Sequence, residues 1–272
     1  MGIAIGLVLY SINYFMDLRI RPLSVVLVTG LAVLITGFMR YNQEQEGQKV
    51  SNDRQLVVGT SADFAPFSYI DNGVITGFDI ELIMEIVRRL DRKLIVQNMP
   101  FGTLISSLQL GTIQVIAAGL TATPERAQHV LFTEPYLEND PLVIVSRKDN
   151  PVKSIDALKN KTVTVNQGYT ADTYVSSISD ITVLRLPTPP DAFLALTSKR
   201  ADALVAARKT LQVFFDQYSQ DNFILFELPN AQENCALAIT PRDPQLRDEI
   251  QYILHAMKKD GSLDQLRKKW NV

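Results

Sequence analysis

The stretch Gly-Leu-Thr-Ala-Thr-Pro-Glu-Arg, residues 119–126, follows directly on the apolar run Val115–Ala118. A short apolar run of this kind is typical of a buried strand. Thr123 suits a helix N-cap and Pro124 the first helical position, so we expect a helix to begin there. The sequence therefore predicts a strand, a turn and a helix start in close succession.

An anion site is one interpretation of this turn. The unpaired N–H groups at the helix start, the Thr121 hydroxyl and the Arg126 guanidinium would lie side by side. The fork of an arginine binds a planar carboxylate through two hydrogen bonds. The alternative is a capped helix with Arg126 in solvent or paired with Glu134. The stretch by itself favours neither interpretation.

Strands and helices alternate on both sides of this stretch. Expected strands cover residues 55–59, 94–98, 114–118, 162–166, 182–186 and 203–205; expected helices cover 77–90, 103–110, 154–159, 190–198, 243–259 and 262–270, with another after Gly168. This alternation favours an α/β protein with helix-flanked, mainly parallel sheets. Because ligands of such sheets bind beyond the carboxyl ends of the strands, we expect the loops at those ends to converge.

The first 40 residues differ from this body. Residues 23–39 form an uncharged apolar run about as long as the shortest membrane-spanning helix, roughly 17 residues. Arg19 and Arg21 precede that run, which predicts that the N-terminal side stays in the cytoplasm and the body is exported. We therefore expect residues 1–40 to be an apolar signal or anchor region and residues 41–54 a polar linker.

Cleavage of this region is left open. Read from Met16, the segment resembles an ordinary signal sequence, so either the true start is Met16 rather than Met1, or residues 3–16 are a second membrane-embedded segment. Phe38 stands where a lipoprotein signal would carry its lipidated cysteine, which excludes a lipid anchor at that position. We expect a periplasmic protein tethered by an uncleaved N-terminal segment, with secretion after cleavage as the alternative.

Composition narrows the classes of function. The formal net charge is −2, which provides no electrostatic case for nucleic acid binding. Cys235 is the only cysteine and His129 and His255 are the only histidines, so neither an intrachain disulfide nor a metal cluster is expected. We expect no cofactor.

Several motifs occur in a fixed order between residues 55 and 270. They are Gly59-Thr60 with Ala65-Pro66-Phe67, Gly77-Phe78-Asp79-Ile80-Glu81-Leu82 followed by Ile86, Val87 and Leu90, Phe101-x-x-Leu104-Ile105, residues 119–126, Val163–Gly168, and Gly261-x-Leu263 with Lys269-Trp270. Together they resemble the amino-acid-type (family 3) solute-binding proteins of bacterial ABC transporters.

The resemblance implies a two-lobed, periplasmic-binding-protein-like fold of type II. One lobe would comprise residues 55–144 with 238–272 and the other residues 145–237, with hinge crossings at 142–146 and 236–240. Such a protein is a monomer that closes over a small carboxylate-bearing solute, most often an amino acid. It presents the closed form to an ABC permease in the inner membrane and catalyses no reaction.

The resemblance also implies a set of ligand-binding residues: Ser61, Phe64, Phe101, Gly119, Thr121, Arg126 and Thr170. The two phenylalanines stand where aromatic rings clasp the ligand side chain, and the glycine would offer backbone groups. Thr121 and Arg126 would hold the α-carboxylate from one lobe, and Thr170 would donate to it from the other. The serine takes a loop position that is often acidic in the family.

One position departs from the family pattern. Members that bind amino acids usually carry an acid a few residues past the pair Asp202-Ala203, and it neutralises the ligand ammonium. This chain has Ala206-Ala207-Arg208 there, and burying an unpaired ammonium is costly. Either Asp63, Glu233 or another acid substitutes, or the ligand lacks a free amine, or affinity has been lost.

Two other functions stay open on these grounds. Some proteins that resemble the family are periplasmic dehydratases of cyclic carboxylates, and such an enzyme needs a general acid, for which Glu134 and Glu233 are candidates. The other alternative is an anchored sensor or a degenerate binding domain.

Overall fold

The computed structural model describes residues 34–40 and 55–272. Residues 34–40 are helical, and residues 55–272 form a compact unit of their own. Within the described parts of the chain, no helix is both long and apolar enough to cross a membrane. The predicted signal or anchor region lies mostly outside the described residues, and the linker 41–54 lies wholly outside them.

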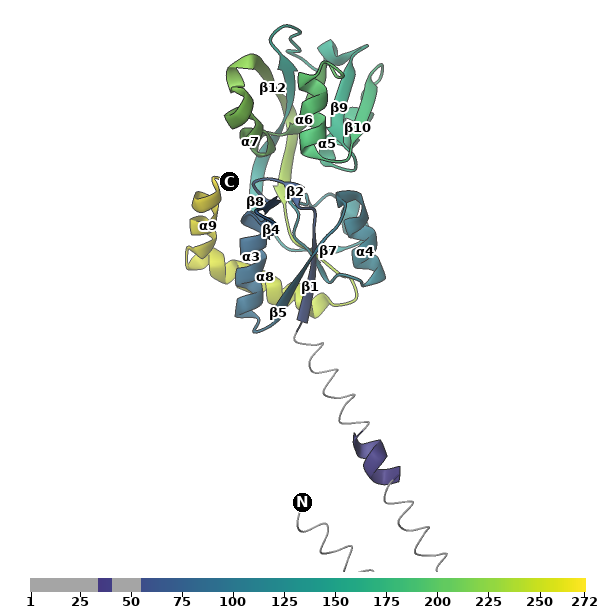
Figure 1. Cartoon of the computed structure of the whole chain (residues 1–272), viewed down its shortest axis with the longest axis vertical. Helices are drawn as coiled ribbons and strands as arrows, with labels where there is room; N and C mark the ends of the chain where they lie inside the picture. Colours follow the sequence, from purple (N-terminus) through teal and green to yellow (C-terminus); the bar gives the residue numbers. More distant parts are fainter. Residues whose placement is uncertain (1–33, 41–54) are drawn as a thin grey trace, which may run out of the picture. The chain divides into compact units, whose positions relative to one another are not determined.

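Two five-stranded sheets and a small three-stranded sheet make up residues 55–272, with helices on the large sheets (Figure 1). The strands are β1 (Gln55–Thr60), β2 (Asp63–Phe64), β3 (Ser68–Asp71), β4 (Val74–Thr76), β5 (Lys93–Asn98), β6 (Val115–Ile116), β7 (Leu131–Phe132), β8 (Leu137–Arg147), β9 (Thr162–Asn166), β10 (Thr182–Leu186), β11 (Ala203–Ala207), β12 (Phe223–Cys235) and β13 (Ala238–Ile239). The helices are α3 (Phe78–Arg89), α4 (Leu104–Leu110), α5 (Thr170–Ser176), α6 (Pro189–Thr197), α7 (Arg208–Tyr218), α8 (Pro244–Lys259) and α9 (Ser262–Trp270).

The first sheet has the order β5-β1-β6-β13-β7, with β1 parallel to both β5 and β6 and β13 antiparallel to its neighbours. Successive residues of its central strand face opposite sides, as the two-residue period of a strand requires. Val115 packs into the core under α3, α8 and α9, whereas Ile116 packs into the core under α4. Helices therefore cover both faces, and we call this sheet with its helices the first lobe.

The second sheet has the order β10-β9-β11-β8-β12, with β9 parallel to β10 and β11 and β8 antiparallel to β11 and β12. Val163 and Val205 pack with α5 on one face, and Val145 and Leu204 pack with α6 and α7 on the other. This sheet with its helices is the second lobe. The predicted two-sheet α/β architecture is confirmed, and each sheet is mixed rather than purely parallel.

Two long strands connect the lobes. Figure 1 shows β8 and β12 running side by side from one lobe into the other, and they pair antiparallel. Their register shifts between Glu227 and Gln232 and again between Glu233 and Cys235. Residues 142–146, expected at a crossing, are instead all paired with β11 inside the second sheet.

The helix predicted after Thr123 is wrong in extent. The chain forms only a single 3₁₀ turn, Arg126–Gln128, in which the Thr123 hydroxyl accepts the Arg126 backbone N–H at 3.2 Å. The cap thus forms as predicted, but no longer helix follows it. A turn this short sums few peptide dipoles, so the predicted helix-dipole contribution to anion binding is lost.

Three elements escape local patterns. Asn72 and Gly73 form the turn between β3 and β4 in the small sheet, a region for which the expected elements include no strand. Helix α7 begins without a capping side chain at Ala207, so it carries no sequence signal for its start. Strand β12 contains Pro229 and Asn230, which usually mark a loop, and the register shift absorbs them.

Candidate functional site

Arg126 lies where the two lobes meet. Its Nη1 donates to the Thr121 carbonyl and its Nη2 donates to the Gly168 carbonyl, each at 2.9 Å. The guanidinium carbon lies 5.7 Å from the centroid of the Phe101 ring. The loop after β6 therefore contacts the loop after β9, as the converging strand ends predict.

The alternative partner of Arg126 is engaged elsewhere. Glu134 lies 2.9 Å from His255 and 3.6 Å from Lys258, on the exposed surface of the first lobe. An ion pair between Arg126 and Glu134 is therefore not formed.

The charged guanidinium group of Arg126 is partly desolvated. Burial lowers the pKa of its guanidinium, and the nearby Glu233 carboxylate acts in the opposite direction. Two of its five N–H groups are used by backbone carbonyls, and the other three make no hydrogen bond to another described residue. These three remain available to an acceptor entering the cleft.

Glu233 supplies a buried acid opposite this arginine. It lies on β12 and accepts a short hydrogen bond from the Thr170 hydroxyl at the start of α5. Burial raises its pKa from 4.5 to about 7; Thr170 and Arg126 lower it, while Asp140 raises it further. Thr170 is thus not an N-cap, because its hydroxyl is directed to a carboxyl group rather than to the backbone.

Asp140 faces Glu233 across the two connecting strands. The two residues are paired in the register of β8 and β12. Burial raises the pKa of Asp140 to about 6, and the Lys209 backbone N–H, which it accepts at 3.2 Å, works against that rise. Two adjacent buried carboxyl groups raise each other's pKa. A cation bound between them would lower both pKa values and so favour ionisation.

Three aromatic rings meet beside these charges. Phe101 stacks on Tyr169 with ring centroids 4.1 Å apart, and Phe64 meets the same tyrosine edge-on at 5.5 Å. Phe64 also stacks on Phe67 in the core of the first lobe. Phe64 therefore both packs in the core and borders the cleft. The two predicted clasping rings are therefore brought together, with a third ring from the second lobe between them.

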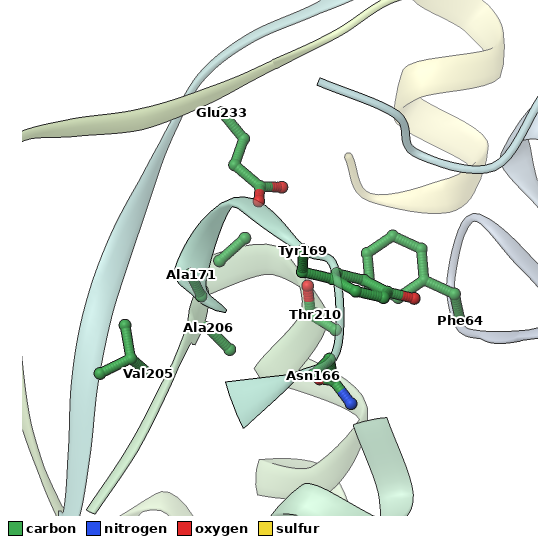
Figure 2. A pocket seen from close by; sticks show the side chains of 9 residues that line it. Phe64, Asn166, Tyr169, Ala171, Val205, Ala206, Thr210 and Glu233 are labelled. Atoms are coloured by element: carbon green, nitrogen blue, oxygen red, sulfur yellow. The ribbon is translucent and has the colours of Figure 1, made fainter. Parts of the chain in front are cut away.

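A cavity of about 10 Å³ remains between the lobes, room for roughly one water molecule. Its lining comprises Phe64, Asn166, Tyr169, Ala171, Val205, Ala206, Ala207, Thr210 and Glu233. Figure 2 shows the Glu233 carboxyl group directed toward the start of α5 and the Tyr169 ring lying against Phe64. Two polar atoms of this lining, Tyr169 Oη and Asn166 Nδ2, are buried without a hydrogen-bond partner among the described residues.

A larger groove is lined in part by Arg126. Its volume is about 690 Å³, and it is lined by Ile105, Thr123, Pro124, Glu125, Arg126, His129, Leu142, Gly168, Thr170, Thr173, Tyr174, Asn230, Ala231 and Gln232. Arg126 and Thr170 therefore line an open groove in addition to making the contacts described above.

Gly119 and Thr121 hold their place through backbone geometry. Gly119 has a φ of +59°, and a Cβ there would lie 2.4 Å from the Phe64 ring. Its carbonyl accepts the Cys235 thiol at 3.4 Å, and Thr121 forms a single antiparallel bridge with the same cysteine. The loop after β6 is thereby tied to the end of β12.

Ser61 is not part of the same cavity. It lines a separate pocket of about 310 Å³ together with Asp63. Its hydroxyl donates to Asp63 at 2.9 Å. Burial raises the pKa of Asp63, and the Ser61 hydrogen bond works against that rise.

The stretch Ala206-Ala207-Arg208 brings no charge to the cavity. Ala207 lines the cavity, while Arg208 turns outward to form a surface ion pair with Glu227 at 3.0 Å. Arg208 therefore does not supply a second cation to the cleft.

The sequence analysis assigned no role to three polar lining residues: Asn166, Tyr169 and Thr210. Asn166 ends β9 and Tyr169 lies in the loop after it, which was expected to converge on the site, so the polar residue types there were the available signal. Thr210 carried none, because it lies on the unanticipated helix α7.

The chain is similar to known proteins over most of its length. ArtP, the arginine-binding extracellular protein of Bacillus subtilis (strain 168), is 32% identical over 225 residues, which is 81% of this chain and 87% of the relative. The structure of an ancestral arginine-binding protein bound to arginine superposes with a TM-score of 0.75 at 34% identity, over 80% of this chain and 98% of that one.

A third similar protein is the ancestral amino acid-binding protein AncCDT-1, a precursor of cyclohexadienyl dehydratase. Its crystal structure has a TM-score of 0.74 at 30% identity and covers 82% of this chain and 98% of that chain. The profile of the bacterial extracellular solute-binding proteins, family 3, matches residues 56–272. The fold, the motifs and these matches together place the chain in family 3 of the bacterial extracellular solute-binding proteins.

Proposed function

We propose that this chain is the substrate-binding component of an ABC importer and captures an amino acid between its two lobes. One observation carries the proposal: a partly buried arginine and a buried glutamate, Arg126 and Glu233, converge within electrostatic reach at the contact between the lobes. A zwitterion carries the complementary pair of charges. ArtP and the ancestral arginine-binding protein, both similar over most of this chain, are named for binding an amino acid.

Arg126 would bind the ligand carboxylate. Its three uncommitted N–H groups suit the two oxygens of a carboxylate, and charge-assisted bonds of this kind are the strong ones. The Thr121 hydroxyl would add a donor from the same loop, and Gly119, whose N–H is bound to Asp79, would hold that loop in place. Thr170 would donate from the second lobe once its hydroxyl leaves Glu233. Phe64 and Phe101 would border the ligand side chain, while Ser61 would act only indirectly, through Asp63.

Glu233 would bind the ligand ammonium in place of the acid missing near Ala207. It is only 5% exposed, and its pKa of about 7 means that a nearby cation would readily ionise it. Asp140, paired with it across the strands, would add a second negative charge. Asp63 is the weaker candidate because its carboxyl group is bound by Ser61 and lines a different pocket.

Transport would follow from lobe closure. We take residues 55–144 with 238–272 and residues 145–237 as the two lobes, with the boundary in β8 moved ahead of Leu142 because residues 142–146 pair inside the second sheet. The hinge would lie where the register of β8 and β12 shifts. The ligand would stabilise the closed form by contacting both lobes, and an ABC permease would recognise that form. We further propose that the mature protein is a periplasmic monomer tethered through its N-terminal segment.

The decisive experiment is a calorimetric titration of the full chain, purified in detergent, with a panel of amino acids and amine-free carboxylates. We expect an amino acid to bind and the Arg126→Ala variant to lose about a hundredfold or more in affinity, because one partner of a desolvated charge pair is removed. Glu233→Gln should weaken amino acids but not amine-free carboxylates.

Two matched controls lie on the surface. Arg208→Ala and Glu227→Gln remove the same charges from an exposed ion pair, and Glu227 stands on the same strand as Glu233. Both should leave affinity unchanged. Failure of every amino acid to bind would contradict the proposal.

A dehydratase is the second candidate, and the same glutamate favours it. A carboxyl group with a pKa of about 7 in a cleft suits a general acid. The similar ancestral protein AncCDT-1 is described as a precursor of a dehydratase. Incubation with cyclic hydroxycarboxylates and mass spectrometry for loss of water would separate the two candidates, since a binding protein returns its ligand unchanged.

A further inference from the structure

The ring of Tyr169 occupies the space between the two rings expected to clasp a ligand. It stacks on Phe101 at 4.1 Å with an interplanar angle of 29°, and it meets Phe64 at 5.5 Å with an angle of 71°. Figure 2 shows the tyrosine lying against Phe64, and both residues line the cavity together with Glu233. The tyrosine comes from the second lobe, whereas both phenylalanines come from the first.

The backbone turn before α5 sets the direction of the Tyr169 side chain. Gly168 has a φ of +78°, and its N–H donates to Asp172 at 3.0 Å, which holds the turn before α5 in one conformation. The next residue is Tyr169, whose side chain enters the aromatic space, and Thr170 follows with its hydroxyl on Glu233. One turn thus delivers a ring to one side and a hydrogen-bond donor to the other.

The ring leaves little room beside it. The cavity is about 10 Å³ and Tyr169 is only 8% exposed, so its ring fills the space beside the two phenylalanines to which the family resemblance assigns a ligand side chain. A ligand with a long side chain in that position must first displace Tyr169 from both phenylalanines. A ligand with a short side chain would leave the ring in place, because its side chain would not extend to the two phenylalanines.

Two unpartnered polar atoms border the same cavity. Tyr169 Oη and Asn166 Nδ2 are both buried without a hydrogen bond to a described residue, and Asn166 is 4% exposed. Buried polar groups are usually satisfied, so these two indicate a polar group brought by the ligand. A hydroxyl on a short side chain can accept from both.

We propose that Tyr169 determines the ligand specificity of this site: its ring excludes amino acids with long side chains, and its hydroxyl, with the Asn166 amide, recognises a small polar side chain of about the size of serine. This inference rests on the proposed capture of an amino acid. It separates this chain from a relative such as ArtP, whose name specifies arginine, at a residue for which sequence reasoning assigned no role.

The test compares serine, alanine and glycine with glutamine and arginine, titrated into the full chain and its variants. The wild-type chain should bind serine at least a hundredfold more tightly than arginine, a ratio that size exclusion in a pocket can produce. Tyr169→Ala should reduce that ratio at least tenfold by gaining affinity for the longer ligands. Tyr169→Phe keeps the ring, so it should retain the exclusion and lose the preference for serine over alanine.

Two controls distinguish a change in ligand specificity from a loss of folded structure. Tyr252→Ala replaces an exposed tyrosine on α8 and should change neither ratio. Each variant should give the circular dichroism spectrum of the wild-type chain, and Tyr169→Phe serves as the conservative variant should Tyr169→Ala unfold.

The outcomes are distinguishable. Equal binding of arginine to the wild-type chain and to Tyr169→Ala would overturn the role of Tyr169 while leaving amino acid capture intact. Loss of the size exclusion in Tyr169→Phe would also overturn it. Absence of binding by every amino acid to every form would overturn the proposed function and this inference together.

Discussion

The carboxyl group of Asp79 accepts a hydrogen bond of 2.5 Å from the backbone N–H of Gly119, although 40 positions separate the two residues. Asp79 belongs to the motif at residues 77–82 and lies in the first turn of α3, fully buried. Gly119 begins the loop that carries Thr121 and Arg126. The motif that decides the fold therefore also holds the proposed carboxylate loop in place.

Removal of this acceptor should destabilise the protein. Asp79→Ala leaves the Gly119 N–H buried without a partner, so we expect a loss of about 1–3 kcal/mol in the free energy of unfolding. Asp79→Asn retains an acceptor oxygen and should lose less. Urea unfolding followed by circular dichroism measures both values, and an Asn variant as unstable as the Ala variant would contradict this role.

Gly119 itself should resist substitution more than another glycine with the same backbone conformation. Its φ is +59°, and an added Cβ would meet the Phe64 ring at 2.4 Å; Gly73 has a φ of +81° with nothing within 4 Å. Gly73→Ala should therefore cost only the left-handed strain, about 1–2 kcal/mol. Gly119→Ala should cost about 1–3 kcal/mol more, because the ring must move. Thermal unfolding of the two variants tests the difference, and equal midpoints would show that the ring moves freely.

Stability should fall as pH rises from about 4 to 7. Burial raises the pKa of Asp79 and of Glu233 to about 7 and that of Asp140 to about 6. Over this range the folded protein keeps protons that the unfolded chain has already released, so ionisation favours unfolding. The decline should level out above pH 7.

Unfolding in urea at pH 5, 6, 7 and 8, without ligand, measures this slope. Asp140→Asn should reduce it, because one of the three groups no longer titrates. A stability that instead increases from pH 5 to pH 7 would show that these carboxyl groups are ionised in the folded protein.

Amino acid affinity should have the opposite pH dependence. Glu233 must be ionised to pair with an ammonium, and its pKa in the free protein is about 7. Binding should therefore release one proton, and affinity should rise about a hundredfold between pH 5 and pH 8. Titration calorimetry in buffers of different ionisation enthalpy counts the proton.

Two comparisons sharpen this prediction. Glu233→Gln should abolish most of the pH dependence, whereas Glu227→Gln, an exposed change on the same strand, should preserve it. Affinity that falls with rising pH would instead indicate a protonated Glu233 in the complex, as the dehydratase alternative requires.

Local physical chemistry was enough for the α/β order, in which the sequence pattern predicted α3 and β10. The family resemblance, and not a local pattern, implied a place for Arg126 at the meeting of two lobes. Local physical chemistry was not enough for the helix after Thr123, because a cap signal states where a helix begins and not how far tertiary contacts let it continue.

The sequence by itself thus determined the fold class, the two series of strands and helices, and the arginine of the site, because periodicity, caps and motifs are properties of neighbouring residues. Only the tertiary structure decided that Glu233 is buried against Thr170, 63 positions away, and that Tyr169 lies between Phe64 and Phe101. Burial, and the pKa that follows from it, depend on which distant segments exclude water from a side chain, and no local pattern encodes that.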